Sequence, residues 1–162
     1  MRHTKMKKGL FVGSFDPPTI GHYAAIVDIL PLFDTLLIAI GVNSSKKTLF
    51  SLKQRLEWLN KMFSQYQNIE IVYFEGLTVD FCKKENINFI VRGLRNGTDF
   101  EYEKTIASVN ESLTGIKTIF IPTRQEYNHV SSTIVRELIY NKADTSKFIH
   151  QSIKISENDI LN

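Results

Sequence analysis

Residues 10–33 read LFVGSFDPPTIGHYAAIVDILPLF, which is a short apolar run, then a polar loop, then an amphipathic segment. The run Leu10-Phe11-Val12 is typical of a buried strand, and the apolar residues of 21–33 recur at helical spacing. The loop between them, residues 13–22, holds two glycines, two prolines and a histidine. This stretch therefore predicts a strand–loop–helix unit.

The same alternation continues along the chain. Further strands are predicted at residues 35–40, 69–73, 89–91 and 118–121, and further helices at residues 51–63, 78–85, 98–113 and 131–140. Capping boxes are predicted at Ser51-Leu52-Lys53-Gln54 and at Thr98-Asp99-Phe100-Glu101, and Thr78 is a candidate N-cap. The tail from Ser146 is predicted to be helical and peripheral.

Apolar strands separated by helices indicate a parallel sheet that is buried on both faces and joined by right-handed crossovers. The predicted fold class is α/β, with a single doubly wound domain around a five-stranded parallel sheet. At 162 residues the chain has the length of one domain. We expect this domain to cover residues 8–162, after a flexible N-terminal extension over residues 1–7.

The composition excludes several classes of protein. Hydrophobic residues make up 43% of the chain and charged residues 23%, which is typical of a globular protein. The net charge of +3 is too small to indicate nucleic acid binding. The single cysteine, Cys82, excludes an internal disulfide framework, and its apolar position favours burial over a nucleophilic role. Asp28, Pro31 and Asp34 interrupt the apolar stretch 26–42, so we expect a cytoplasmic protein without a membrane span.

Ligands of doubly wound sheets bind beyond the carboxyl ends of the strands. The loops expected at that edge are residues 13–22, 41–50, 75–77, 92–98 and 123–130. Between them they carry seven basic or imidazole side chains that we expect to converge on one crevice: His22, Lys46, Lys47, Arg92, Arg95, Arg124 and His129. A cleft lined by positive charge favours an anionic substrate.

The first loop is the strongest single motif. Gly13 suits a sharp turn, Ser14 offers a hydroxyl, and Gly21 lets a ligand approach the backbone. His22 is expected in the first turn of the helix, where backbone N–H groups and the helix dipole favour anions. The alternative interpretation is a rigid Pro-Pro turn with an incidental histidine.

Three motifs together resemble those of a known enzyme family. Residues 13–22 are similar to the (H/T)xGH loop of the nucleotidylyltransferase superfamily. Arg92-Gly93-Leu94-Arg95, followed by Asp99-Phe100-Glu101-Tyr102-Glu103, is similar to the signature of the bacterial phosphopantetheine adenylyltransferases, and Ser131-Ser132-Thr133-Ile134-Val135-Arg136-Glu137 resembles their nucleotide motif. The resemblance covers residues 8–148 and implies the Rossmann-like nucleotidylyltransferase fold.

The family's reaction transfers the adenylyl group of ATP to 4′-phosphopantetheine, giving dephospho-coenzyme A and pyrophosphate in coenzyme A biosynthesis. The resemblance implies direct in-line attack without a covalent enzyme intermediate. A phosphate monoester has a second pKa of about 6, so the nucleophile is already mostly dianionic near neutral pH and needs no general base. Such a reaction needs cations, fixed N–H donors and alignment of the two substrates.

The resemblance implies a role for each matching residue. His22 is expected to stabilise the α-phosphate in the transition state, with Lys46 and Arg92 as the other catalytic residues. The residues expected to bind 4′-phosphopantetheine are Ser14, Lys46, Thr78 and Arg92. The residues expected to bind ATP are Ser14, Phe15, His22, Gly93, Leu94, Arg95, Glu103, Tyr127, Asn128, His129, Val130, Ser131, Ser132 and Thr133.

Some assignments leave alternatives open. Lys47 could replace Lys46 if the match is displaced by one residue. His129 stands where other members carry an aromatic or apolar residue, so a structural role is favoured over a catalytic one.

Mg²⁺ is implied as the partner of ATP, bound mainly through phosphates, and no protein ligand to the metal is predicted. The resemblance also implies a homohexamer and feedback by coenzyme A.

Three other functions compete with this hypothesis. An adenylyltransferase for another phosphate, such as nicotinate mononucleotide, is disfavoured by the block at residues 92–103. A non-catalytic nucleotide or coenzyme A sensor could use the same fold. A nucleic-acid binder would need a stripe of cations with stacked aromatic residues, whereas the cations here lie in ligand loops.

Overall fold

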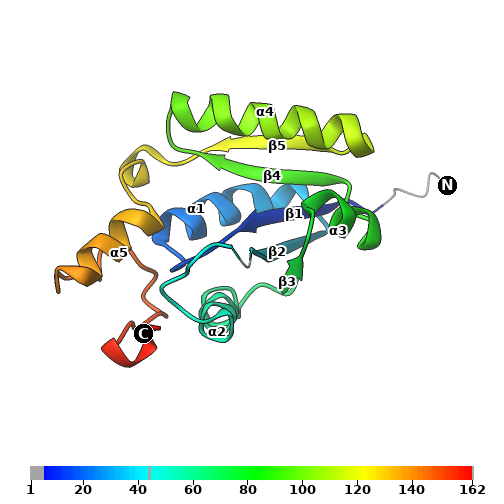
Figure 1. Cartoon of the computed structure of the whole chain (residues 1–162). Helices are drawn as coiled ribbons and strands as arrows, with labels where there is room; N and C mark the ends of the chain where they lie inside the picture. The colour runs from blue at the N-terminus through cyan, green and yellow to red at the C-terminus, as the bar shows by residue number, and fades with distance from the viewer. Residues whose placement is uncertain (1–5, 44, 162) are drawn as a thin grey trace.

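The computed structural model describes residues 6–43 and 45–161. Five strands form one all-parallel sheet in the order β3-β2-β1-β4-β5 (Figure 1), which confirms the predicted fold class. The strands are β1 (Lys8–Gly13), β2 (Thr35–Val42), β3 (Ile69–Glu75), β4 (Phe89–Leu94) and β5 (Lys117–Pro122). Most of the predicted N-terminal extension, residues 1–5, lies outside the described residues. Lys7 is tied to the sheet, because its N–H donates to Asp34 Oδ2 at 2.6 Å.

Helices cover both faces of the sheet. They are α1 (Ile20–Ile29), α2 (Leu52–Met62), α3 (Thr78–Lys84), α4 (Gly97–Thr114) and α5 (Ser132–Tyr140), with short 3-10 turns η1 (Leu30–Leu32), η2 (Gln125–Tyr127) and η3 (Glu157–Asp159). Figure 1 shows α4 lying along β4 and β5, while α5 lies at the opposite end of the sheet from the N-terminus. Within the described residues, no helix combines the length and apolar character needed to cross a membrane.

Strand residues alternate between two apolar clusters. Phe11 and Ile38 pack with α1, α2 and α5 on one face of the sheet, whereas Leu10 and Leu37 pack with α3 on the other. All four side chains are at most 4% exposed, as expected of strands buried on both faces. Cys82 lies in the second cluster, and burial raises the pKa of its thiol to about 11. Its predicted role as a buried apolar residue is therefore confirmed.

The helix ends differ in part from the predictions. Ser51 caps α2, as expected, by accepting from Gln54 N–H, but the Gln54 side chain does not complete the predicted capping box, and α4 is capped by Asn96 and not by Thr98. Asn96 Oδ1 accepts from Asp99 N–H at 2.9 Å, so the helix begins at Gly97, before the predicted cap Thr98. The N-cap of α3 is Leu77, which leaves Thr78 as the first helical residue.

The prediction for the tail was wrong. Apart from η3 and the bridge at Ile160, residues 146–161 form turns and irregular segments, and they are not peripheral. Ile149 and Ile153 are buried in the α2 face of the core, and Ile160 forms an antiparallel bridge with Phe50. Burial of these apolar side chains against the core overrides the local helical propensity of the segment.

Candidate active site

A cavity of about 280 Å³ opens at the carboxyl ends of the strands. It is lined by parts of the β1–α1, β2–α2 and β4–α4 loops and by the start of α5, as expected for a doubly wound sheet. The structure brings together eleven of the predicted site residues in this cavity: Ser14, His22, Lys46, Arg92, Gly93, Arg95, Glu103, Val130, Ser131, Ser132 and Thr133.

Three of the seven cations expected in the crevice do not line it. Lys47 is exposed beside Lys46, so the structure favours Lys46 as the residue of the cavity. Arg124 forms an ion pair with Asp28 on the outside of α1, where its Nε donates to Oδ2 at 2.9 Å. His129 packs edge-on against Phe148, with ring centroids 6.0 Å apart. The expectation that all seven side chains converge on one crevice was therefore wrong. Arg124 is held outside it by Asp28, and His129 packs against Phe148.

Four further residues predicted to bind ATP lie outside the lining: Phe15, Leu94, Tyr127 and Asn128. Phe15 is 1% exposed and packs on the His22 ring, with centroids 4.9 Å apart. Phe15 therefore packs against the histidine ring and does not line the cavity.

The ring of His22 is oriented by the helix cap that precedes it. Thr19 is the N-cap of α1, and its backbone N–H donates to His22 Nδ1 at 3.0 Å. A backbone N–H can only donate, so Nδ1 is an acceptor and the proton of the neutral ring sits on Nε2. The Thr19 hydroxyl, 2.9 Å from Nδ1, completes this cap. His22 therefore offers an N–H donor, and not a base, to the cavity that it lines.

The surroundings of His22 also keep the ring neutral. Burial, followed by the positive charges of Arg95 and Arg92, lowers the pKa of His22 from 6.5 to about 4. Near neutral pH the ring is therefore uncharged, and it faces an anion as a neutral hydrogen-bond donor.

This shift predicts a pH-dependent loss of stability. Between pH 6.5 and 4 the unfolded chain binds a proton at His22 that the folded chain does not. The contribution of the neutral His22 ring to the free energy of unfolding is thus fully present above pH 6.5 and is lost as the pH falls toward 4. We expect the free energy of unfolding, measured in urea, to fall by up to about 2 kcal/mol more between pH 7 and 5 in the wild type than in His22→Gln. Equal pH slopes for the two proteins would contradict the shift.

Two arginines of the cavity are held by carboxylates of α4. Arg92 Nε and Nη2 donate to Glu103 Oε2 and Oε1 at 2.8 and 2.6 Å, and Nη1 donates to the Val12 carbonyl. Arg95 donates to both oxygens of Asp99 at 2.9 and 3.1 Å. Such bidentate pairs fix the plane of a guanidinium group. Glu103 therefore orients Arg92 across the end of β1.

A second cavity of about 220 Å³ adjoins the first, and the two share Val12, Arg92 and Glu103. Its remaining lining is mixed in polarity: Thr78, Ile90, Tyr102, Ile106, Ala107, Asn110 and Thr118. Thr118 Oγ1 is a buried side-chain oxygen without a hydrogen-bond partner among the described residues. The two cavities therefore adjoin at Arg92.

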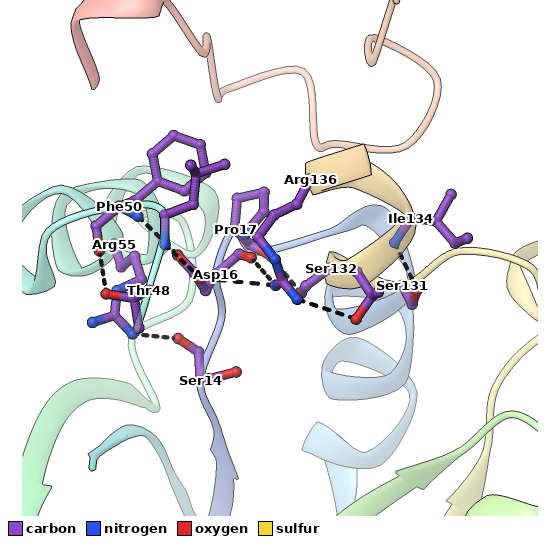
Figure 2. Close-up of polar contacts among 12 residues, drawn as sticks. Ser14, Asp16, Pro17, Thr48, Phe50, Arg55, Ser131, Ser132, Ile134 and Arg136 are labelled. Atoms are coloured by element: carbon purple, nitrogen blue, oxygen red, sulfur yellow. Dashed lines mark hydrogen bonds and ion pairs between the residues drawn. The ribbon is translucent and has the colours of Figure 1, made fainter. Parts of the chain in front are cut away.

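The start of α5 is joined directly to the first loop (Figure 2). Ser131 caps the helix by accepting from Ile134 N–H at 3.2 Å, and Ser132 Oγ donates to the Pro17 carbonyl at 2.8 Å. Arg136 Nη1 donates to the Asp16 carbonyl at 2.6 Å. This places backbone N–H groups of a helix start beside His22, which is an arrangement suited to phosphates.

Four polar residues of the cavity were not predicted: Thr19, Asp99, Thr123 and Arg136. Arg136 could have been found, because it follows Ser132 by four residues and therefore lies on the same face of α5. Asp99 lies in the signature block and Thr123 opens the loop 123–130 expected at the ligand edge, but neither was assigned a role in the site.

The chain is similar to known proteins over most of its length. Residues 10–138 match the family model described as cytidylyltransferase-like. A phosphopantetheine adenylyltransferase of Flavobacterium psychrophilum is 45% identical over 150 residues, covering 93% of this chain and 99% of the relative. One of Christiangramia forsetii is 48% identical over 136 residues, covering 84% and 90%.

Solved structures support the fold. A Vibrio parahaemolyticus protein assigned as a nicotinate-nucleotide adenylyltransferase superimposes with a TM-score of 0.62 at 15% identity, covering 91% of this chain and 96% of the other. At that identity the likeness concerns the fold alone.

Proposed function

The chain belongs to the cytidylyltransferase-like family and, within it, to the phosphopantetheine adenylyltransferases, and from this premise we propose that it transfers the adenylyl group of ATP to 4′-phosphopantetheine. It is a nucleotidyltransferase, and its place is in coenzyme A biosynthesis. The observation that carries the substrate assignment is the pair of adjoining cavities that meet at Arg92.

The first cavity suits the nucleotide. It presents the N-terminus of α5, the hydroxyls of Ser131 and Ser132 and the N–H of His22. Phosphates bind at helix starts because the N–H groups there lack partners and the helix dipole is positive. We place the triphosphate of ATP in this cavity, with Mg²⁺ entering as part of the MgATP substrate.

The second cavity suits the pantetheine arm. The arm contains two amides and apolar segments between them, and the cavity offers Asn110, the unpartnered Thr118 hydroxyl and apolar side chains. With the arm there, its phosphate lies near Arg92 at the junction, within the cavity that also holds Lys46 and Ser14. The predicted contact of Thr78 with the arm is supported, because Thr78 lines this cavity.

The mechanism follows from these positions. A phosphate oxygen of 4′-phosphopantetheine attacks the α-phosphorus of ATP in line, the bond to the β-phosphate breaks, and pyrophosphate leaves. No base is required, because the nucleophile is a dianion. The neutral His22 donates from Nε2 to the charge that develops on the α-phosphate, while Lys46 and Arg92 hold the acceptor phosphate in line. No residue forms a covalent intermediate.

We also propose that the protein is a cytoplasmic homohexamer and that coenzyme A inhibits it. Coenzyme A carries a pantetheine arm and an adenine nucleotide, so it can occupy both cavities at once.

In support of subunit contact in the proposed hexamer, α4 exposes several large apolar side chains, among them Val109 at 51% and Leu113 at 59%. Light scattering is expected to give about six times the chain mass of 18.7 kDa.

Pyrophosphate release tests the proposed function. With ATP and Mg²⁺, we expect release only when 4′-phosphopantetheine is added, and none with nicotinate mononucleotide. Turnover with nicotinate mononucleotide alone would support the other adenylyltransferase. Binding of both substrates without pyrophosphate release would identify a sensor instead of an enzyme.

A further inference from the structure

Asp16 lies beside the proposed site but has no role in the mechanism above. Its side chain is 2% exposed, and a carboxylate that is buried to this extent needs hydrogen-bond partners. Oδ2 accepts from Leu49 N–H at 2.9 Å, and Oδ1 accepts from Phe50 N–H at 3.0 Å. Both oxygens therefore bind one short stretch of backbone, 33 and 34 residues further along the chain.

That stretch ends the loop that carries Lys46. Only Lys47 and Thr48 separate Lys46 from Leu49, and the Thr48 hydroxyl donates to the Phe50 carbonyl at 3.1 Å. Figure 2 shows this turn lying against Asp16. Asp16 therefore holds the backbone only three residues beyond Lys46 in the chain.

Asp16 is also where the first loop meets α5. Its carbonyl accepts from Arg136 Nη1 at 2.6 Å, and the same nitrogen lies 3.7 Å from Asp16 Oδ2. On the other side the buried Arg55 donates to the Ser14 carbonyl at 2.7 Å. In Figure 2 Asp16 lies between the turn at Phe50 and the start of α5. One carboxylate thus joins three segments that line the first cavity.

We propose that Asp16 is a positioning residue that sets the Lys46 side chain relative to Ser14 and His22, and that Arg136 ties the phosphate-binding start of α5 to the same point. This inference rests on the proposed function, because it concerns how the acceptor phosphate is held. The chemistry requires an acid at this position. A carboxylate accepts two N–H bonds, whereas the isosteric amide of asparagine accepts one and turns its NH₂ group toward the other N–H.

A double-mutant cycle tests the proposal. Asp16→Asn is expected to lower kcat/KM for 4′-phosphopantetheine about tenfold, mainly through KM, while KM for ATP changes less than about twofold. In a Lys46→Met background the same substitution is expected to change kcat/KM less than about twofold, because Asp16 acts through Lys46. Multiplicative effects of the two substitutions would overturn the proposal.

A purely structural role predicts a different result. A partly unfolded enzyme has fewer active molecules, so its apparent kcat falls while both KM values stay unchanged. That outcome for Asp16→Asn would refute a positioning role. Asp34→Asn is the matched control, since Asp34 also accepts a backbone N–H, from Lys7 at the far end of β2, and its kinetics are expected to match the wild type.

A second variant covers the case in which Asp16→Asn fails to fold. Thr48→Val removes only the hydroxyl that bonds the Phe50 carbonyl and keeps the shape of the side chain. It is expected to raise KM for 4′-phosphopantetheine about threefold and to have no further effect in the Lys46→Met background. An unchanged KM in a folded Thr48→Val would count against the proposal. A wild type without pyrophosphate release would instead refute the proposed function.

Discussion

Replacing His22 with alanine is expected to lower kcat about 10²- to 10³-fold while the dissociation constant of ATP changes less than about threefold. The Nε2–H of a neutral ring, fixed by the Thr19 cap, meets the α-phosphate most closely when charge develops there in the transition state. Removing it therefore affects turnover much more than ground-state binding. Pyrophosphate release gives kcat, and calorimetry with ATP gives the dissociation constant.

Two comparisons sharpen this prediction. His150→Ala serves as the control, because His150 packs on Tyr23 outside both cavities and its loss is expected to leave kcat within about twofold. Near-normal turnover in His22→Ala would show that His22 does not stabilise the transition state. Equal losses in ATP affinity and kcat/KM would instead identify it as a ground-state binding residue.

Replacing Lys46 with methionine is expected to lower kcat/KM for 4′-phosphopantetheine about 10- to 100-fold. The lysine lines the first cavity, where a charge-assisted hydrogen bond to the acceptor phosphate is expected to contribute about 1.5–3 kcal/mol. Methionine keeps the length and apolar character of the side chain but removes the charge. Steady-state kinetics with 4′-phosphopantetheine varied at saturating ATP measure the effect.

The adjacent lysine provides a matched control. Lys47 is exposed and does not line the cavity, so Lys47→Met is expected to leave kcat/KM within about twofold of the wild type. A large loss in Lys47→Met with none in Lys46→Met would show that the loop binds phosphate through the other residue. Equal losses in both variants would indicate a general effect of positive charge on the approach of the substrate.

The strands and helices could be predicted because their signals are local. The apolar run Leu10-Phe11-Val12 and its counterparts mark every strand within two or three residues at each end. Helix caps were less certain, since several residues can cap one helix. Asn96 caps α4 by accepting from Asp99 N–H, and the choice of Asn96 over Thr98 is set by the folded geometry of the β4–α4 loop.

The site was predictable where a residue lies at the end of a strand or the start of a helix. Ser14, His22, Arg92 and Ser132 occupy such places, and the parallel sheet brings them to one edge. Arg124 and His129 come from a loop at the same edge, but Arg124 forms an ion pair with Asp28 and His129 packs against Phe148. A position at the edge thus favours a role in the site but does not decide where a long side chain points.

The sequence by itself determined the order of strands and helices, the edge of the sheet at which ligands bind and the motifs that identify the family, because each depends on neighbours along the chain. The tertiary structure decided the neutral state of His22, the choice of Lys46 over Lys47, the burial of the tail and the contacts of Asp16. These depend on atoms tens of residues apart that meet only after folding, when burial and nearby charge set the protonation and orientation of each group.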